Sequence, residues 1–306
     1  MVGFGRIARA EHRPAIDASP AFELVAIVDP LASPVGVPAF RDLESLLGAG
    51  LDVDAVALCQ PPQARYDAAR LALDAGVHVL LEKPPGATVA EVESLHALAR
   101  SSGRTLFAAW HSRFAPALPQ AKAWLAGRIV RSVSIVWREN VREWHPGQQW
   151  IWSPGGFGVF DPGINAISLV TALLETPLRV RDGTLHVPAN HAMPIAAELS
   201  LATPDGIDVA AHFDWRAAGR AEWEIRIVTD EGDLKVSDGG ARLSCDGTEL
   251  AVGPSREYAG VYARFASLIA TGECDVDLTP LRTAADALLR CEVRRVESFH
   301  EGPHGG

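Results

Sequence analysis

The chain opens with MVGFGRIA (residues 1–8), and this stretch decides the fold of its first part. It matches the pattern G-x-G-x-x-A at Gly3, Gly5 and Ala8. In this pattern the first glycine permits a tight turn, the second lets the backbone approach a pyrophosphate, and the small third residue allows close helix packing. Amides at the helix N-terminus then face the phosphates. The stretch predicts a Rossmann-type unit that holds a dinucleotide.

An acidic residue stands where this interpretation needs one. The apolar run FELVAIVD (residues 22–29) predicts a strand that ends in Asp29, about 20 residues after the glycine loop. A carboxylate at this place accepts hydrogen bonds from the adenosine ribose and repels a 2′-phosphate. We therefore expect NAD as the cofactor and leave NADP open. The alternative is that Asp29 and Pro30 only end the strand.

The beginning of the chain is unusual for this motif, because only Met1 and Val2 precede Gly3. The glycine loop should follow a strand at the centre of the sheet. We therefore expect the first strand to be largely missing, through truncation or a misplaced start, and an upstream export signal would be lost with it.

Strand and helix patterns alternate through the rest of residues 1–112. Apolar runs at 55–59, 77–83 and 105–110 predict strands, and residues 88–103 predict a helix with the capping box Thr88-x-x-Glu91. The alternation favours a doubly wound parallel sheet. Lys83 ends one strand, at the sheet edge where ligands of such folds bind. It is either a functional group or a solvated edge residue.

Residues 113–306 have a different character and predict a second domain, an α+β domain with a large, mostly antiparallel sheet. Residues 131–139 alternate in hydrophobicity, and turn dipeptides at 205–206, 231–232 and 246–247 predict three hairpins. Residues 261–272 and 279–299 have the period of amphipathic helices. We expect residues 300–306 to form a frayed tail.

Composition limits the classes of partner. The 306-residue chain has a formal net charge of −10 and no basic block, which argues against binding to nucleic acid or to an anionic membrane. Its four cysteines are scattered without a C-x-x-C pair. This spacing argues against a metal site and favours reduced thiols in a cytoplasmic protein.

The stretch GVFDPGIN (residues 158–165) has two interpretations. Asp161 followed by Pro162 is typical of a helix N-cap with proline at the first helical position. A helix starting here would also place Asp161 and Asn165 on one face, where the carboxylate could act as a base. Upstream, tryptophans at 144, 150 and 152 surround His145. Such aromatic faces suit sugar rings, although at least one of these tryptophans should be a core residue.

Three stretches together, GFGRIA, EKPPG and GGFGVFDPGIN, resemble the Gfo/Idh/MocA oxidoreductase family. Within it, HPGQQWIW joined to GVFDPGIN is similar to aldose 1-dehydrogenases. The resemblance implies an NAD(P)-binding Rossmann domain and a sheet domain through which the chain forms a homo-oligomer, a dimer or a tetramer. It also implies oxidation of the anomeric C1 of a pyranose, such as D-galactose, L-arabinose or D-fucose, to the lactone.

The resemblance also places Lys83 and Asp161 in the catalytic centre. Asn165 stands where many relatives carry a histidine, and an amide cannot take a proton, so the base is Asp161 or, alternatively, Lys83. We expect Asp161 as the base and Lys83 as the cation at the C1 oxygen. The predicted sugar-binding residues are Asn165, Glu139, His145, Trp152 and His111, and the predicted cofactor-binding residues are Gly3, Phe4, Gly5, Arg6, Ile7, Asp29, Glu82 and Lys83.

Other functions stay open at this point, because a fold does not determine its chemistry. The chain could act on another polyol or a cyclic imine. It could instead bind the dinucleotide as a regulator without turnover, although the presence of Lys83 and Asp161 argues against this. An inactive truncation product is the remaining alternative.

Overall fold

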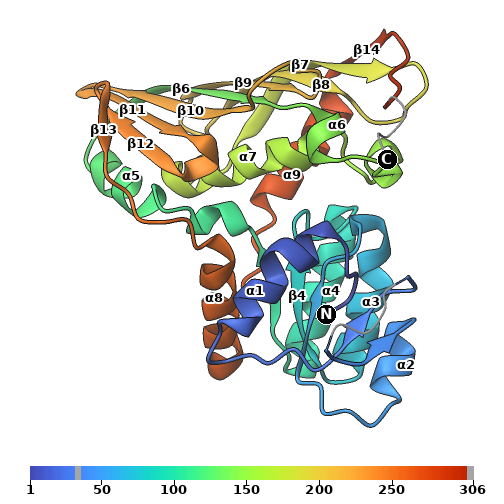
Figure 1. Cartoon of the computed structure of the whole chain (residues 1–306). Coiled ribbons are helices and arrows are strands. Elements are labelled where there is room, and N and C mark those ends of the chain that lie inside the picture. The colour runs from blue at the N-terminus through green and yellow to red at the C-terminus, as the bar shows by residue number, and fades with distance from the viewer. Residues whose placement is uncertain (32–35, 302–306) are drawn as a thin grey trace. The chain divides into compact units, whose positions relative to one another are not determined.

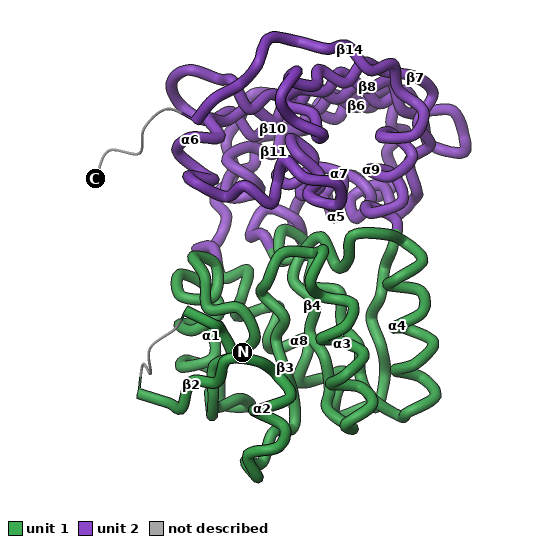
Figure 2. The backbone as a smooth tube through the Cα atoms, turned by 90° about the vertical axis from the view of Figure 1, so that its right-hand side faces the viewer, with its two compact units in different colours: residues 1–114, 256–278 green, residues 115–255, 279–306 purple. Residues whose placement is uncertain are grey.

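The computed structural model describes residues 1–31 and 36–301, and the chain divides into two compact units. Unit 1 contains residues 1–114 and 256–278, and unit 2 contains residues 115–255 and 279–306 (Figure 2). The domain ranges expected from the sequence, 1–112 and 113–306, differ from this division mainly in one respect. The segment 256–278 belongs to unit 1, although it comes late in the chain.

Unit 1 is built on parallel strands. Strands β3, β4 and β5 pair in that order, and β1 pairs with β2. Val2 bridges Val28 of β1 and Leu58 of β3 in parallel, so residues 1–3 lie at the centre of the sheet, as the glycine motif requires. The elements of unit 1 are η1 (Ala8–His12), α1 (Arg13–Asp17), β1 (Ile27–Val28), β2 (Ala39–Phe40), α2 (Leu43–Leu47), β3 (Ala55–Leu58), η2 (Pro62–Ala64), α3 (Arg65–Asp74), β4 (His78–Glu82), α4 (Val89–Ser102), β5 (Leu106–Ala109), η3 (His111–Phe114) and α8 (Glu257–Thr271).

The predicted Rossmann elements are confirmed, with one strand shortened. Helix α4 begins at the predicted capping box, in which Thr88 and Glu91 bond each other's backbone amides, and it ends at the left-handed Gly103. The run 22–29 forms strand only at Ile27–Val28. Burial explains the difference, because Phe22 and Leu24 turn into the core of the unit instead of extending the strand pairing.

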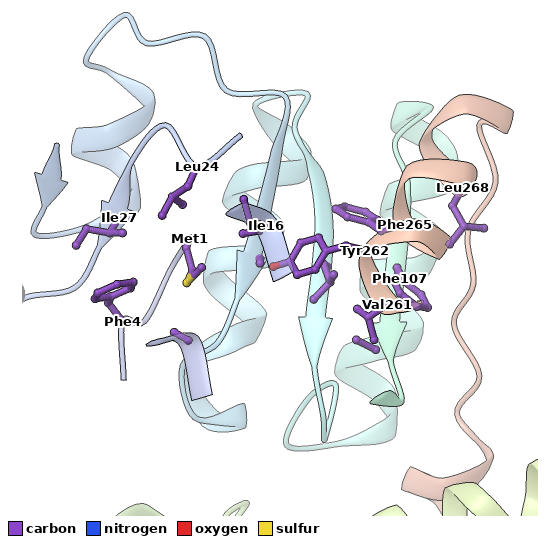
Figure 3. Close-up of a cluster of buried hydrophobic side chains, with 14 residues drawn as sticks. Met1, Phe4, Ile16, Leu24, Ile27, Phe107, Val261, Tyr262, Phe265 and Leu268 are labelled. Carbon is purple, nitrogen blue, oxygen red and sulfur yellow. The ribbon is translucent and has the colours of Figure 1, made fainter. Parts of the chain in front are cut away.

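Helix α8 belongs to unit 1 because its apolar face completes the core of that unit. Tyr262 and Phe265 lie in one buried cluster with Phe107 of β5 (Figure 3). The Phe265 ring stacks on Phe22 with a centroid distance of 5.5 Å and lies 6.2 Å from Phe107. Periodicity predicts the helix, but it carries no information about which sheet the apolar face covers.

Unit 2 is a nine-stranded sheet with the order β13-β12-β11-β10-β6-β9-β8-β7-β14. The strands pair antiparallel except β6 with β9 and β14 with β7. Helices α5, α7 and α9 lie along one face (Figure 1). The elements are α5 (Leu118–Leu125), β6 (Val130–Arg138), α6 (Val141–Trp144), η4 (Gln149–Trp152), α7 (Phe160–Leu174), β7 (Arg179–Pro188), β8 (Ala196–Ala202), β9 (Asp208–Asp214), β10 (Glu222–Thr229), β11 (Gly232–Ser237), η5 (Asp238–Gly240), β12 (Arg242–Cys245), β13 (Thr248–Leu250), α9 (Thr279–Arg290) and β14 (Glu292–Val296).

The three predicted hairpins are confirmed, joining β8 to β9, β10 to β11 and β12 to β13. The predicted helix over 279–299 is wrong in its second half. Helix α9 ends at Arg290, and EVRRV forms the edge strand β14 paired with β7. The backbone hydrogen bonds formed with β7 stabilise a strand here, although the hydrophobic pattern of these residues has the period of a helix. The frayed tail is also wrong for His300 and Glu301, which bond to other segments, while residues 302–306 lie outside the described residues. No helix in the described ranges is long and apolar enough to cross a membrane.

Helix α7 starts two residues earlier than predicted. Its N-cap is Val159, so Asp161 and Pro162 occupy the second and third helical positions, and the Asp161 side chain is not the cap. Close packing explains this start, because Phe160 is fully buried and meets Phe213 of β9 edge-to-face at 5.8 Å. Gly163 lies directly against the same ring: a Cβ on it would lie 2.8 Å from the Phe213 ring.

We expect Gly163→Ala to destabilise unit 2, because the added methyl group overlaps the fully buried Phe213 ring. Overpacking of this kind lowers the free energy of unfolding by about 1–3 kcal/mol, more than the helix propensity of alanine adds. Urea unfolding followed by tryptophan fluorescence measures the change. Ala172→Gly, at a half-exposed position of the same helix, is the control for propensity, and an alanine at 163 that raised stability would contradict the packing.

Candidate active site

The glycine turn of unit 1 has the geometry that a dinucleotide needs. Gly3 has φ +80°, and a Cβ on it would lie 2.7 Å from the Gln60 backbone nitrogen, so only glycine fits. Gly5 has open space around its Cα, and the residues after it are exposed at the start of a helical segment. The first amides of a helix have no partner within the helix, so this turn can hold a pyrophosphate.

Asp29 is held at the end of β1 by backbone amides. Its Oδ2 accepts a hydrogen bond from the Phe4 amide at 2.8 Å, and its Oδ1 accepts one from the Leu31 amide at 2.9 Å. At the end of β3, the buried Oε1 of Gln60 lacks a partner among the described residues. The glycine turn, the oriented carboxylate and the unsatisfied acceptor fit a bound dinucleotide.

Lys83 follows β4 directly and precedes a cis peptide bond to Pro84. The preceding residue, Glu82, is buried. Its carboxylate accepts three hydrogen bonds: from the Lys83 amide at 2.6 Å, from the Tyr258 hydroxyl at 2.5 Å and from His12 Nε2 at 3.2 Å. The carboxylate therefore faces protein groups and orients the lysine backbone. A direct cofactor contact by Glu82 stays a prediction.

His12 and Glu82 form a buried ion pair. Burial opposes a charge on His12, but Cys59 and the Glu82 carboxylate outweigh it and raise the pKa of His12 from 6.5 to about 10. Burial also opposes a charge on Glu82, yet the His12 hydrogen bond and charge hold the pKa of that carboxyl well below its ordinary 4.5. The other His12 nitrogen, Nδ1, lies 2.8 Å from the Tyr262 hydroxyl, so both ring nitrogens have partners.

This pair predicts a pH window for stability. The raised pKa of His12 contributes stability below pH 6.5 that is lost as the pH rises toward about 10, and the lowered pKa of Glu82 contributes stability above pH 4.5 that is lost in acid. Removal of one partner of a buried pair lowers the free energy of unfolding by about 3–5 kcal/mol. His12→Gln should therefore lower the unfolding temperature most between pH 4.5 and 6.5.

Thermal unfolding of the wild type and of His12→Gln across this range measures the difference. His96→Gln is the control. Burial lowers the pKa of His96, so the stability that His96 contributes changes with pH in the opposite direction to that of His12. A stability difference at position 12 that did not change with pH would contradict the ion pair.

Two further residues surround the Lys83 segment. Arg65 is buried and donates hydrogen bonds to the carbonyls of Glu82 and Pro84. His111, a predicted sugar-binding residue, lies in unit 1, where its Nδ1 is 2.6 Å from Glu257 Oε2 and its ring stacks on Tyr258. Sequence reasoning missed Arg65, His12 and Tyr258, because the pattern around each is that of an ordinary helix.

Unit 2 brings three of the predicted site residues together. His145 Nε2 lies 3.8 Å from Asp161 Oδ2 and 3.4 Å from Glu139 Oε1. Both carboxylate side chains are about 4% exposed and His145 is 16% exposed, so the cluster is largely withdrawn from water. Two carboxylates and an imidazole that converge in this way can accept protons and bind hydroxyl groups.

Glu139 is fixed by two indole groups that the sequence reasoning did not select. Trp223 Nε1 donates to its Oε2 at 2.9 Å, and Trp215 Nε1 donates to its Oε1 at 3.2 Å. Trp144 packs edge-to-face on Trp223 at 4.9 Å. The two indoles come from positions 76 and 84 residues away in sequence, so no local spacing marks them as partners.

The remaining predicted residues are placed differently. Asn165 is half-buried one turn beyond Asp161 on α7, on the same helix face, as the spacing predicts. Trp152 is 3% exposed, stacks on His191 at 4.4 Å and meets Trp215 edge-to-face at 5.3 Å. It therefore packs as a core residue, and a sugar contact for it stays a prediction. No cluster of three or more potential metal ligands occurs within residues 1–31 and 36–301.

Comparison with known proteins defines the class. Residues 1–110 match the family model described as Gfo/Idh/MocA, an oxidoreductase family with an NAD-binding Rossmann fold. The chain is 45% identical to galactose 1-dehydrogenase of Pseudomonas fluorescens over 305 residues, which is 98% of both chains. The chain therefore belongs to the Gfo/Idh/MocA oxidoreductases, and the expected enzyme class, fold and nicotinamide cofactor are confirmed.

The fold recurs in solved structures. The crystal structure of D-galactose-1-dehydrogenase from Rhizobium etli superposes with a TM-score of 0.93 at 48% identity, covering 98% of this chain and 96% of that one. KijD10, a 3-ketoreductase from Actinomadura kijaniata in complex with NADP and TDP-benzene, has a TM-score of 0.83 at 20% identity, covering 96% and 98%. The second likeness shows a shared fold only.

Proposed function

We propose that this chain oxidises the anomeric carbon of a pyranose such as D-galactose, L-arabinose or D-fucose to the lactone, with NAD as the acceptor. The observation that carries the proposal is the buried cluster of Asp161, His145 and Glu139, held by two indole groups. The high identity to galactose 1-dehydrogenase over the whole chain supports the same substrate class.

The proposed chemistry removes a hydride equivalent from C1 and a proton from its hydroxyl group. Bound NAD supplies the acceptor for the hydride, and the glycine turn with Asp29 would hold it. Asp161 takes the proton of the C1 hydroxyl as general base. Lys83 stabilises the negative charge that develops on the C1 oxygen. The opposite assignment, with a neutral Lys83 as base, makes the same product and is separated by the variants described in the Discussion.

The other polar groups of the cluster would recognise the ring hydroxyls. Asn165 offers both a donor and an acceptor but cannot titrate, so we assign it to binding alone. Glu139 retains acceptor capacity beyond its two indole bonds, and His145 stands between it and Asp161. A site that hydrogen-bonds hydroxyl groups in this way discriminates strongly against analogues that lack them.

A sugar panel tests this proposal. Reduction of NAD and of NADP is followed by the absorbance of the reduced nicotinamide with D-galactose, L-arabinose, D-fucose, D-glucose and myo-inositol. We expect turnover of the first three sugars, faster with NAD. No turnover with any sugar, together with retained NADH binding, would favour the regulator; turnover of myo-inositol alone would favour another polyol.

We further infer a homo-oligomer and a cytoplasmic location. The sheet face opposite α7 carries ion pairs such as Arg138–Glu222 and Lys235–Glu224, a polar surface that a second copy could cover. All four cysteines lie in the described part of the chain and none forms a disulfide, which suits a reducing compartment. Sedimentation of the purified chain tests the first inference, and a monomer mass at all concentrations would remove it.

A further inference from the structure

The chain returns to the predicted sugar-binding cluster after its edge strand. Beyond β14 it runs toward α6 (Figure 1), and Phe299 is anchored there by Asn190. The Asn190 side chain donates to the Phe299 carbonyl at 2.8 Å and accepts from the Phe299 amide at 2.9 Å. His191 Nε2 also lies 3.0 Å from that carbonyl. Residues 299–301, here called the latch, are therefore held in one place.

The latch bonds to the segment 141–152, which carries His145. Arg142 donates to the His300 carbonyl at 2.8 Å, and its guanidinium lies 4.4 Å from the centre of the Phe299 ring. Glu301 makes two bonds to this segment: its Oε2 accepts from the Gly147 amide at 2.9 Å, and its Oε1 accepts from Trp152 Nε1 at 3.1 Å. One carboxylate thus joins the middle of the segment to its end.

The segment depends on such contacts for its order. It contains only two helical pieces, α6 and η4, of four residues each. Helices this short are unstable without tertiary packing. Charge-assisted hydrogen bonds are stronger than neutral ones. The Glu301 carboxylate therefore helps to hold Gly147 in place, and Gly147 lies two residues from His145.

The latch also reaches the cluster through two indole rings in contact. Glu301 holds Trp152, the Trp152 ring meets Trp215 edge-to-face at 5.3 Å, and Trp215 donates to Glu139. The two routes, through Gly147 and through Trp152, end on His145 and Glu139. Both groups belong to the cluster to which we assigned the sugar hydroxyls.

We propose that residues 299–301 act as a latch that orders the sugar-binding segment 141–152, with Glu301 as its positioning residue. The proposal rests on the proposed function for its kinetic part, because it assigns the segment to sugar binding. The ordering itself does not require turnover. Glu301 touches no reacting atom in this proposal and acts through Gly147 and Trp152.

The test compares Glu301→Ala with Glu297→Ala, which removes an exposed carboxylate four residues earlier in the same tail. Amide hydrogen exchange of the peptides covering 141–152 is measured in the absence of sugar. We expect at least a tenfold faster exchange in Glu301→Ala, strongest at Gly147, with wild-type rates in Glu297→Ala. Glu301→Gln keeps one acceptor oxygen and should give an intermediate rate.

Steady-state kinetics give the second readout. Loss of the latch should raise the KM for D-galactose about tenfold, the effect of losing roughly one charge-assisted hydrogen bond, while the KM for NAD and the unfolding temperature change little. Wild-type exchange in Glu301→Ala, or faster exchange with an unchanged sugar KM, would overturn the proposal. If the wild type oxidised no sugar but the segment still loosened, the proposed function would fail and the ordering role would stand.

Discussion

Asp161→Asn should lower kcat for D-galactose by about 10²–10⁴-fold, the usual contribution of a positioned general base. The amide has nearly the same shape as the carboxylate but cannot accept a proton. The helix start should tolerate it, because the Asp161 side chain does not cap α7. Initial rates at saturating NAD, with NADH binding measured by fluorescence, separate lost chemistry from a lost cofactor site.

Chemical rescue sharpens this test. In Asp161→Ala, added formate can occupy the space of the missing carboxylate and should restore part of the rate. Asp205→Asn, in the exposed turn between β8 and β9, is the matched control and should keep wild-type activity. Full activity of Asp161→Asn would remove the base role from this residue and leave Asp161 as a buried structural group of α7.

Lys83→Met should lower kcat by about 10²–10³-fold, because it removes the cation that stabilises charge on the C1 oxygen. Methionine keeps a long unbranched side chain, so packing around position 83 should change little. The loss should appear mainly in kcat and less in the KM for the sugar, since the charge develops only in the transition state. Steady-state rates against sugar concentration measure this division.

The two catalytic assignments predict different rescue patterns. If Lys83 is the electrostatic group, Lys83→Met is not restored by small primary amines at high pH, whereas an unprotonated amine could replace a lysine base. Lys122→Met is the control, because the Lys122 ammonium group forms an exposed ion pair with Glu175 at 3.0 Å. Amine rescue of Lys83→Met, together with an active Asp161→Asn, would assign the base to Lys83.

Local patterns predicted most of the elements correctly. The glycine turn, the capping box of α4 and the three hairpins depend on residues within a few positions of each other, so the sequence contains their physical causes. The prediction that residues 292–299 are helical is wrong because β14 forms by pairing with β7, more than a hundred residues earlier. The placement of α8 in unit 1 likewise depends on distant partners such as Phe107.

The candidate active site shows the same difference between residues marked by local motifs and residues placed by distant contacts. Asp161, Asn165 and Lys83 could be selected because they stand in short motifs at helix and strand ends. The partners that hold the two predicted glutamates could not be selected: Tyr258 donates to Glu82 across 176 positions, and Trp223 donates to Glu139 across 84. A buried tryptophan that donates to a carboxylate has the same sequence pattern as one that only fills a core. Long-range hydrogen bonds are decided by the tertiary fold.

The position of oxidation on the sugar is the most direct test of the proposed function. The fold alone leaves the ring position open, so D-galactose deuterated at C1 and, separately, at C3 should be oxidised with NAD, and the deuterium content of the product NADH measured by mass spectrometry. Deuterium in the NADH from the C1-labelled sugar alone, with the lactone as product, is the predicted result. Deuterium from the C3-labelled sugar, or unlabelled NADH from the C1-labelled sugar, would contradict anomeric oxidation.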